Sequence, residues 1–303
     1  MDFLLFFTSN FFHYLKELWL PLLMGFLASG FFYQFVPTDQ VQKYLGGQGI
    51  KPIVIASLIG AALPVCCIGT LPLALTLRRK QASLGAVITF LIATPATSIP
   101  ALFICWKLLG IGFTVLTFIG AVFMAIVVGV VCDGIKINPK VQNTPDQKSC
   151  CHKEEPQEIG KSFNEKIQKT FKYAFWTLPR GIGLEIILGI SLSSFILSFQ
   201  PLQHFIHTYL SGLTGYAVII IFGLVTYVCS TGDVPIAHAF IKAGMSKGQA
   251  LSYLLVGPIT SYSTILVVDK EFGRHVLVIY LVAISLISFL FGILTDIYLY
   301  RFV

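Results

Sequence analysis

Three cysteines of this sequence have the chemistry of ligands for a soft metal ion. Cys66 and Cys67 are adjacent in the segment ALPVCCIGTLPLAL (62–75), and Cys229 stands in TYVCSTGDVPIAHA (226–239). Thiolates bind Cu(I), Zn(II) and thiophilic metalloids such as trivalent arsenic. Buried free cysteines are also ordinary apolar packing groups. We therefore hypothesise a soft-metal site made by these three thiols, with apolar packing as the alternative interpretation.

The same two segments contain residues that break helices, which are Gly69 and Pro72 in the first and Gly232 and Pro235 in the second. A proline inside a helix removes a backbone donor and frees a carbonyl group. In lipid, such a break persists only where it faces protein or a watery cavity. We predict that each pair interrupts its helix. The alternative is that these residues merely kink or pack membrane helices, in which both are common.

A second pair of segments is interrupted in a similar way, namely IATPATSIP (92–100) and LVGPITSYS (255–263). Matched interruptions in the two halves of a chain are typical of the substrate site of a secondary transporter. The ends of half-helices add partial charges at such a site. The predicted substrate-binding residues are the thiols, hydroxyls and prolines at these breaks: Cys66, Cys67, Cys229, Ser230, Thr94, Pro95, Thr97, Ser98, Pro258, Thr260 and Ser261.

Three ionisable residues within apolar stretches are candidates for coupling transport to a driving ion. Asp233 lies between Gly232 and Pro235, His238 follows one to two turns later, and Glu185 stands in a separate apolar stretch. Ionisable side chains inside a membrane are costly and are functional candidates by default. Protonation of Asp233 or Glu185 would couple the substrate to protons. The alternative is a structural charge pair, for example with Arg180, or a position closer to the membrane interface.

A polar segment in the middle of the chain contains SCCHKEE (149–155), with Cys150, Cys151 and His152 as candidate soft-metal ligands. Two adjacent thiols cannot close a structural zinc site, which needs four ligands. We therefore expect at most a docking or delivery site for metal there, with an incidental cysteine pair as the alternative.

The composition predicts that these residues lie in membrane helices. Of the 303 residues, 55% are hydrophobic and 12% are charged, whereas soluble domains carry about 25% charged residues. The mean hydropathy is +0.81. The net charge of +7 comes mainly from residues between apolar stretches, so it indicates membrane topology rather than nucleic-acid binding. The seven cysteines are odd in number and mostly apolar in context, which argues against a secreted disulfide framework.

Eight apolar stretches are each about long enough to cross a hydrocarbon core of roughly 30 Å. We predict an all-α polytopic membrane protein with spans at 18–36, 52–77, 84–109, 111–132, 173–199, 216–241, 250–268 and 276–299. They divide the chain into an N-terminal lead-in (1–17), a first repeat (18–135), a cytoplasmic linker (136–172) and a second repeat (173–303). The lead-in lacks the basic region and the cleavage site of a signal peptide. We expect the protein in the plasma membrane, and the distribution of lysine and arginine places both termini in the cytoplasm.

An internal repeat is the strongest sign of this organisation. A gap-free alignment of the chain with itself that places Gly60 on Gly223 also places Cys66 on Cys229 and Pro95 on Pro258. In this repeat alignment the identical positions gather at glycine, proline, cysteine, serine and threonine rather than at leucine and valine. Four crossings in each copy would make the repeats parallel, and an odd number would make them inverted.

These motifs resemble a known permease family. PVCCIGTLPLALTLRRKQASLGAVITFLIATPAT and VCSTGDVPIAHAFIKAGMSKGQALSYLLVGPITS are similar to its two signatures. The family includes organoarsenical efflux permeases of the ArsP type and relatives proposed to export copper or zinc, and the SCCHKEE segment is more similar to the latter. The first signature usually reads P-x-C-S-C-G, whereas here the second thiol is displaced by one position, to Cys67. The resemblance therefore implies a permease more firmly than it implies a thiol-bound substrate.

Our leading interpretation is a secondary transporter that exports a soft metal ion or metalloid by alternating access, without a cofactor. A permease for a small anion or a sulfur compound is the alternative within the same class. An intramembrane enzyme or a scaffold is less well supported, because the sequence contains no H-E-x-x-H, G-x-S-x-G or nucleotide-binding motif. The expected partners are the lipid bilayer, a small inorganic or organometallic substrate, and protons. The sequence does not indicate an oligomeric state.

Overall fold

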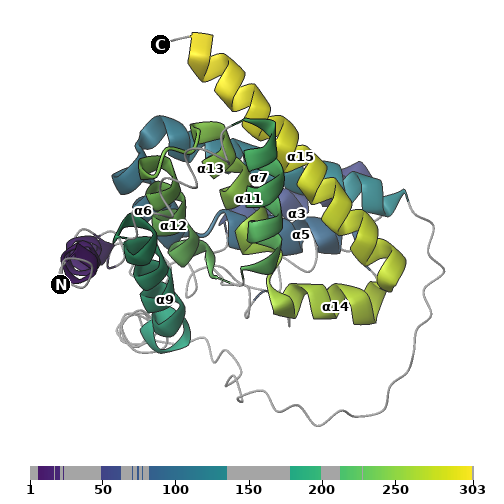
Figure 1. Cartoon of the computed structure of the whole chain (residues 1–303). Coiled ribbons are helices and arrows are strands. Elements are labelled where there is room, and N and C mark those ends of the chain that lie inside the picture. Colours follow the sequence, from purple (N-terminus) through teal and green to yellow (C-terminus); the bar gives the residue numbers. More distant parts are fainter. Residues whose placement is uncertain are drawn as a thin grey trace.

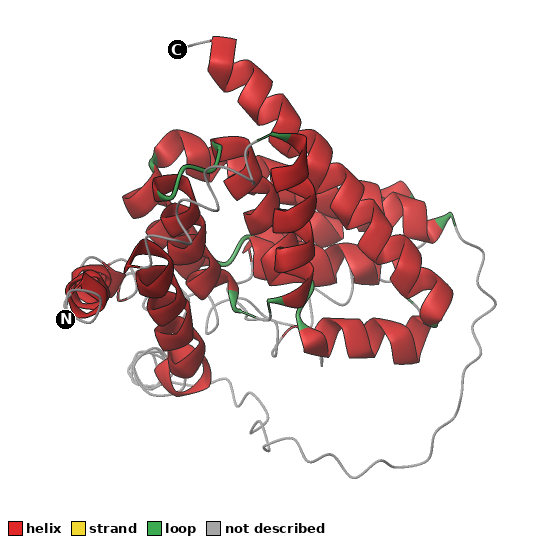
Figure 2. Cartoon of the chain, viewed as in Figure 1, coloured by secondary structure: helices red, strands yellow, loops and turns green. Residues whose placement is uncertain are grey.

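A computed structural model of the chain describes most of both predicted repeats. It covers residues 6–16, 18–20, 23, 49–62, 70, 74, 77, 82–134, 178–198, 212–226 and 228–301. Every regular element in these residues is a helix, and they contain no strand (Figure 2). The predicted linker (136–172) lies outside the described residues.

Among the described residues, the N-terminal part of the chain supplies a helical segment at residues 6–16 and four helices with complete bounds. These are α3 (Ile50–Ala62), α5 (Leu84–Ala96), α6 (Ile99–Leu109) and α7 (Ile111–Asp133). Ser83 begins α5, because its side chain accepts a hydrogen bond from the amide of Ala86, as a serine at a helix N-terminus commonly does.

The C-terminal part supplies α9 (Leu178–Ser198), α11 (Leu213–Val225), α12 (Ser230–Lys242), α13 (Lys247–Val256), the 3-10 turn η2 (Gly257–Ile259), α14 (Tyr262–Phe272) and α15 (Arg274–Arg301). Ser246 and Gln249 form a capping box at the start of α13, in which each residue satisfies an amide of the other. In Figure 1, α6, α9 and α12 lie on one side of the molecule, and α15 crosses it diagonally and joins α14 at a sharp corner.

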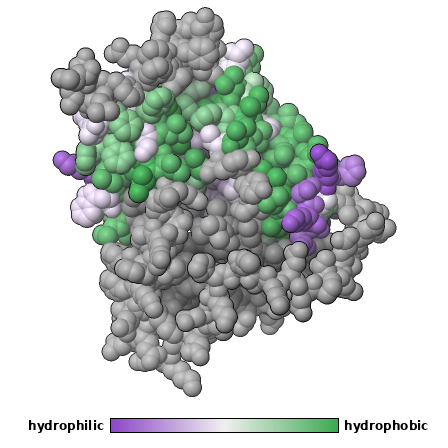
Figure 3. All heavy atoms as spheres, turned by 60° about the horizontal axis from the view of Figure 1, so that its bottom comes forward, coloured by the Kyte–Doolittle hydropathy of each residue, from purple (hydrophilic) through white to green (hydrophobic). Residues whose placement is uncertain are grey.

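Two of these helices, α7 and α15, are long and apolar enough to cross a membrane, and up to four spans result if the bent pairs α5–α6 and α13–α14 each count as one. The outer face of α15 exposes an apolar residue at every turn, including Val282, Leu286 and Leu290. Figure 3 shows an apolar surface with hydrophilic residues at its edges. Lipid tails are as apolar as these side chains, so the long apolar helices and this surface indicate an α-helical membrane protein. The eight predicted spans stay a prediction.

The helices of the two halves begin at corresponding positions. The repeat alignment pairs the first residues of α3 and α11, of α5 and α13, of α6 and α14, and of α7 and α15. The turn before each last helix is also the same, since Gly110 and Gly273 both have a φ angle of 88°. A left-handed φ angle of this kind favours glycine, which explains why this residue type stands at both corners.

Glycines allow α7 to cross α5 at close range in the first half. A Cβ atom on Gly85 would lie 2.5 Å from the carbonyl oxygen of Gly129, and one on Gly129 would collide with the side chain of Thr89. The Thr89 hydroxyl donates a hydrogen bond of 3.1 Å to the carbonyl of Ala125 in α7. Small residues and interhelical hydrogen bonds of this kind hold membrane helices together.

The second half uses the same contacts between α13 and α15. Gly248 and Gly292 pack against each other without room for a Cβ atom. The Ser252 hydroxyl donates to the carbonyl of Ser288 at 2.8 Å. The repeat alignment pairs Ser252 with Thr89 and Ser288 with Ala125, so the two crossings correspond position by position.

The two halves meet along several elements. Helix α7 packs against α15, α5 packs against η2, and α6 packs against α12. Phe123 of α7 and Phe291 of α15 lie with ring centroids 5.4 Å apart, and Gly120 of α7 fits against Phe291 and Leu255. The interrupted segments of the first half therefore lie beside those of the second half.

Candidate functional site

The break in the first half lies between α5 and α6. Pro95 is the second-last residue of α5, the chain leaves the helix at Thr97 and Ser98, and the two helices meet at a bend of 46°. The Thr97 hydroxyl donates to the Ala93 carbonyl at 2.7 Å, and the Thr94 hydroxyl donates to the Phe90 carbonyl at 2.8 Å. Both threonines are fully buried, so their hydroxyls satisfy carbonyl groups near the break.

The break in the second half lies at η2, between α13 and α14, where the chain bends by 60°. Pro258 is inside η2, and Thr260 and Ser261 follow it. The Thr260 hydroxyl lies 3.2 Å from the carbonyl oxygen of Gly223 in α11 and 3.1 Å from that of Val256. The Tyr280 hydroxyl of α15 donates to the Ile259 carbonyl at 3.0 Å. The hydroxyls of Thr260 and Tyr280 thus bond to backbone carbonyls at and beside the break.

A third interruption lies between the end of α11 at Val225 and the start of α12 at Ser230, and its position corrects the sequence prediction. Gly232 and Pro235 do not break the helix, because both lie inside α12. The helix begins instead at Cys229, whose carbonyl accepts hydrogen bonds from the amides of Gly232 and Asp233. Asp233 is then in the first helical turn, where the helix dipole favours a negative side chain.

The N-terminus of α12 connects the two halves at their breaks. The Ser230 hydroxyl, in the first turn of α12, is hydrogen-bonded to the Ser98 hydroxyl of the first break at 2.7 Å. Asp233 contacts the second break, because a Cβ atom on Gly257 would lie 2.9 Å from its Oδ2 atom. The structure therefore brings together predicted site residues that are far apart in the sequence.

Asp233 is fully buried and is hydrogen-bonded to a tyrosine that the sequence did not single out. The Tyr253 hydroxyl donates to Asp233 Oδ1 at 2.7 Å, and Tyr253 is itself fully buried. The Tyr253 ring lies 5.8 Å from the ring of Phe222 and 5.7 Å from that of Phe240. A signal was available, since Tyr253 adds a hydroxyl to its apolar run where the first half has a phenylalanine, Phe90.

The other two predicted coupling residues do not lie in this contact. His238 is on α12, but its Nδ1 atom is 2.9 Å from the Tyr14 hydroxyl of the N-terminal helical segment. Tyr14 is buried, so His238 attaches the lead-in to α12. Glu185 belongs to α9, which packs along α12, but its side chain lies outside the described residues.

The described cysteines divide into one at the site and two elsewhere. Cys229 is the residue that precedes α12 and is 8% exposed. Cys105 and Cys132 are buried in α6 and α7, in agreement with a packing role. In the part of the chain that the structure describes, no group of three or more His, Cys, Asp and Glu side chains is arranged to hold a metal ion.

The remaining predicted ligands and break residues lie outside the described residues: Cys66, Cys67, Gly69, Pro72, Cys150, Cys151 and His152. Thr70, which follows Gly69, is described and is buried. A thiol site shared by the two halves therefore stays a prediction.

Sequence comparison finds relatives over nearly the whole chain. It is 24% identical to UPF0718 protein MJ0584 of Methanocaldococcus jannaschii, over 92% of each chain. It is 21% identical to UPF0718 protein YraQ of Escherichia coli, over 87% of this chain and 73% of that protein. A Streptococcus mutans protein, named as a candidate subunit of a two-component membrane permease complex, is 21% identical over 91% of this chain and 90% of its own. No solved structure matches.

A family model matches nearly the whole chain. The model described as "Predicted permease", of the ArsP type, matches residues 5–297. This range includes all of the interrupted helices and the contacts between the halves. A family described as permeases indicates a transporter rather than an enzyme. The chain belongs to this family of predicted membrane permeases.

Proposed function

We propose that the protein is a secondary transporter that exports a soft metal ion or a thiophilic metalloid from the cytoplasm. The observation that supports this most directly is the hydrogen bond between Ser98 and Ser230, because it joins an interrupted helix of one half to the start of a helix in the other. Substrate sites of secondary transporters form at such interrupted helices, between repeated halves.

The chemistry of the interruptions fits a small polar substrate. Two helices begin there, α6 after Ser98 and α12 after Cys229, and each helix N-terminus carries a partial positive charge. The hydroxyls of Ser98 and Ser230 and the thiol-bearing Cys229 are next to these termini. In this proposal Cys66, Cys67 and Cys229 bind the substrate. The hydroxyls and prolines of the breaks at Pro95 and Pro258 surround it.

The matched helices support a duplicated unit and alternating access. The repeat alignment pairs four helices of each half, and the glycine crossings and hydroxyl–carbonyl bonds recur at the paired positions. We propose that the two copies each contain four spans, that they rock against each other, and that both termini lie in the cytoplasm. Protonation of Asp233 or Glu185 would provide the driving force, and Cys150, Cys151 and His152 would capture the metal before transport.

A second candidate is a permease for a small anion or a sulfur compound. The observation that favours it is the pair of hydroxyls at two helix N-termini, because backbone amides and hydroxyls at helix N-termini bind anions. The lack of a metal-ligand cluster among the described residues is compatible with either candidate.

Uptake by everted membrane vesicles tests the proposal. Vesicles that contain the protein are offered Cu(I), Zn(II), Cd(II) and trivalent arsenicals, and the accumulated substrate is measured. Wild-type vesicles should accumulate at least one of them. Cys66→Ser and Cys229→Ser should each lower the uptake about tenfold or more, because each removes one thiolate ligand. A tenfold loss of affinity corresponds to about 1.4 kcal/mol of binding free energy.

Cys132→Ser is the matched control, because Cys132 is also a buried thiol but belongs to α7, which contains none of the predicted break motifs. It should retain uptake at the wild-type level. Uptake of none of the four substrates above that of vesicles lacking the protein would refute export of a soft metal. Uptake that survives both cysteine substitutions would show that these thiols do not bind the substrate.

A further inference from the structure

We propose that Tyr253 is a positioning residue that holds the Asp233 carboxylate against the second helix break, and that this acid–phenol pair confines ion coupling to the second half of the chain. The role in coupling rests on the proposed transport function. The positioning of the carboxylate rests on contacts that can be measured without transport.

The contacts fix both partners tightly. The Tyr253 hydroxyl donates to Asp233 Oδ1 at 2.7 Å, and both side chains have no exposed surface. A hydrogen bond to a charged acceptor is short and about twice as strong as one between neutral groups. The rings of Phe222 and Phe240 hold the Tyr253 ring, the latter edge to face at 89°, so the hydroxyl has little freedom to turn away.

The third member of the arrangement is Gly257, the first residue of η2. A Cβ atom there would lie 2.9 Å from Oδ2 and 3.3 Å from Cγ of Asp233. Real Cβ atoms do not approach a neighbour so closely, so the carboxylate occupies the space that the absent side chain leaves. Asp233 therefore contacts the backbone of the break directly, and a movement of this backbone would displace the carboxylate.

The first half has a different residue at each of the three corresponding positions. The repeat alignment pairs Asp233 with Thr70, Tyr253 with Phe90, and Gly257 with Thr94. The first half thus lacks the acid, lacks the hydroxyl that would orient it, and carries a side chain at the position where Gly257 leaves room for it.

The hydroxyl of Thr94 donates to the Phe90 carbonyl of its own helix at 2.8 Å, and Thr70 is buried. Threonine and phenylalanine carry no charge, so the first half has no ionisable side chain at any of the three positions. All three differences between the halves concern the Asp233 carboxylate, which is present, hydrogen-bonded and given room only in the second half. Packing alone would be satisfied by the uncharged residues of the first half in both copies, so the differences indicate a function of the second half alone.

Infrared difference spectroscopy of the purified full-length protein in lipid nanodiscs tests the positioning. The carboxylate and carboxyl bands of Asp233 are identified as those lost in Asp233→Asn. Tyr253→Phe removes one hydroxyl and keeps the ring between Phe222 and Phe240. It should shift the Asp233 bands, because the carboxylate loses its phenol donor.

Tyr280→Phe is the matched control for the spectrum. It removes an equally buried hydroxyl from the same break, but this hydroxyl donates to the Ile259 carbonyl rather than to Asp233. The Asp233 bands should keep their wild-type positions in this variant. Asp233 bands that are identical in wild type and Tyr253→Phe, or that shift equally in Tyr280→Phe, would overturn the positioning role.

Vesicle uptake tests the consequence for coupling. Tyr253→Phe should lower the uptake rate about tenfold, and it should have no further effect in the Asp233→Asn background, because its target is then gone. Two independent losses that multiply would overturn the coupling role. If the bands shift as expected but no substrate is taken up by the wild type, the positioning stands and the proposed transport function fails instead.

Discussion

Among the individual residues, two aspartates link the start of one helix to the end of another. Asp133 accepts a hydrogen bond from the Gly85 amide at 3.1 Å. Asp296 accepts one from the Gly248 amide at 2.7 Å and a second from the Tyr216 hydroxyl at 2.5 Å. A carboxylate near a helix N-terminus is stabilised by the free amides and by the helix dipole. The two aspartates therefore fasten α7 to α5 and α15 to α13.

The unequal number of partners predicts unequal stability effects. Asp133→Ala should lower the free energy of unfolding by about 1 kcal/mol, whereas Asp296→Ala should lower it by about 2–3 kcal/mol, because it also leaves the Tyr216 hydroxyl without its acceptor. Denaturant or thermal unfolding of the purified protein in one detergent measures both. Each variant is the control of the other, and equal losses would contradict the bonds as described.

Among the helices, the crossing of α5 and α7 depends on Gly129. Gly129→Ala places a methyl group on Thr89, so it should separate the helices and lower the free energy of unfolding by about 1–3 kcal/mol. Gly112→Ala is a control in the same helix, because a Cβ atom there would meet nothing within 4 Å. The thermal unfolding midpoint should fall in the first variant and stay the same or rise in the second. A similar fall in both would show that the crossing does not depend on Gly129.

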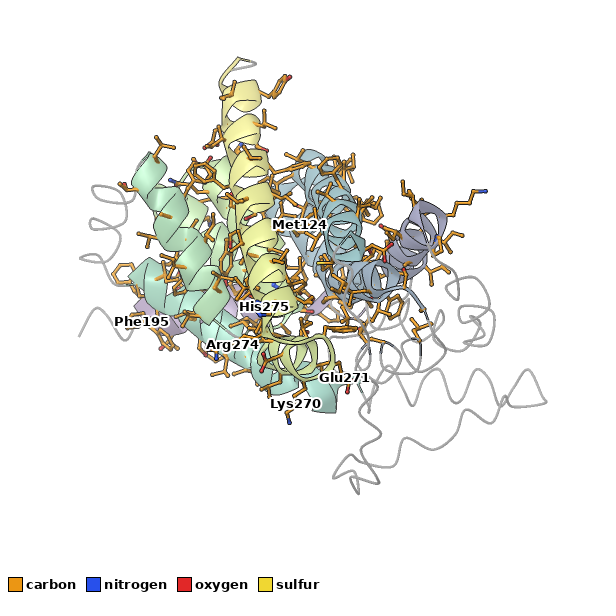
Figure 4. All side chains as sticks on the ribbon, turned by 90° about the vertical axis from the view of Figure 1, so that its right-hand side faces the viewer. Met124, Phe195, Lys270, Glu271, Arg274 and His275 are labelled. Carbon is orange, nitrogen blue, oxygen red and sulfur yellow. The ribbon has the colours of Figure 1, made fainter. Side chains whose placement is uncertain are left out.

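The corner between α14 and α15 differs in character from the one between α6 and α7. Figure 4 shows Lys270, Glu271, Arg274 and His275 gathered at the former, and all four are exposed. The latter has Trp106 and Ile111 exposed instead. The repeat alignment nevertheless pairs Lys107 with Lys270, and both corners turn at a left-handed glycine.

For the whole molecule, the proposed parallel repeats predict the side of the membrane on which these corners lie. Lys107→Cys and Lys270→Cys, each in a background without the other accessible cysteines, should both react with a membrane-impermeant maleimide added to intact cells. The linker cysteines Cys150 and Cys151, retained in a separate variant, should react only after the cells are opened. Labelling of the two corners from opposite sides would mean that the repeats are inverted, and it would refute four crossings in each half.

Local features of the sequence were sufficient to predict an all-helical membrane protein and the positions of its two long apolar helices, because the predicted spans 111–132 and 276–299 coincide with most of α7 and α15. High hydropathy and low charge require lipid-facing helices, and the break between α5 and α6 and the one at η2 fall in the two segments predicted from Pro95 and Pro258. These features depend on residues close together in the chain. The prediction for Gly232 and Pro235 was wrong for a local reason as well, because Cys229 starts a helix upstream that accommodates both residues.

The identity of the side chains that meet, in contrast, followed from the packing of the helices. The pairs Ser98–Ser230 and Asp233–Tyr253 join residues 132 and 20 positions apart, and the roles of Asp133 and Asp296 as partners of helix amides also come from packing. In a uniformly apolar helix, hydrophobic periodicity does not tell which face is buried, because lipid and protein accept the same side chains. Interhelical contacts at glycines and hydroxyls select the face, and those contacts exist only once the helices are packed.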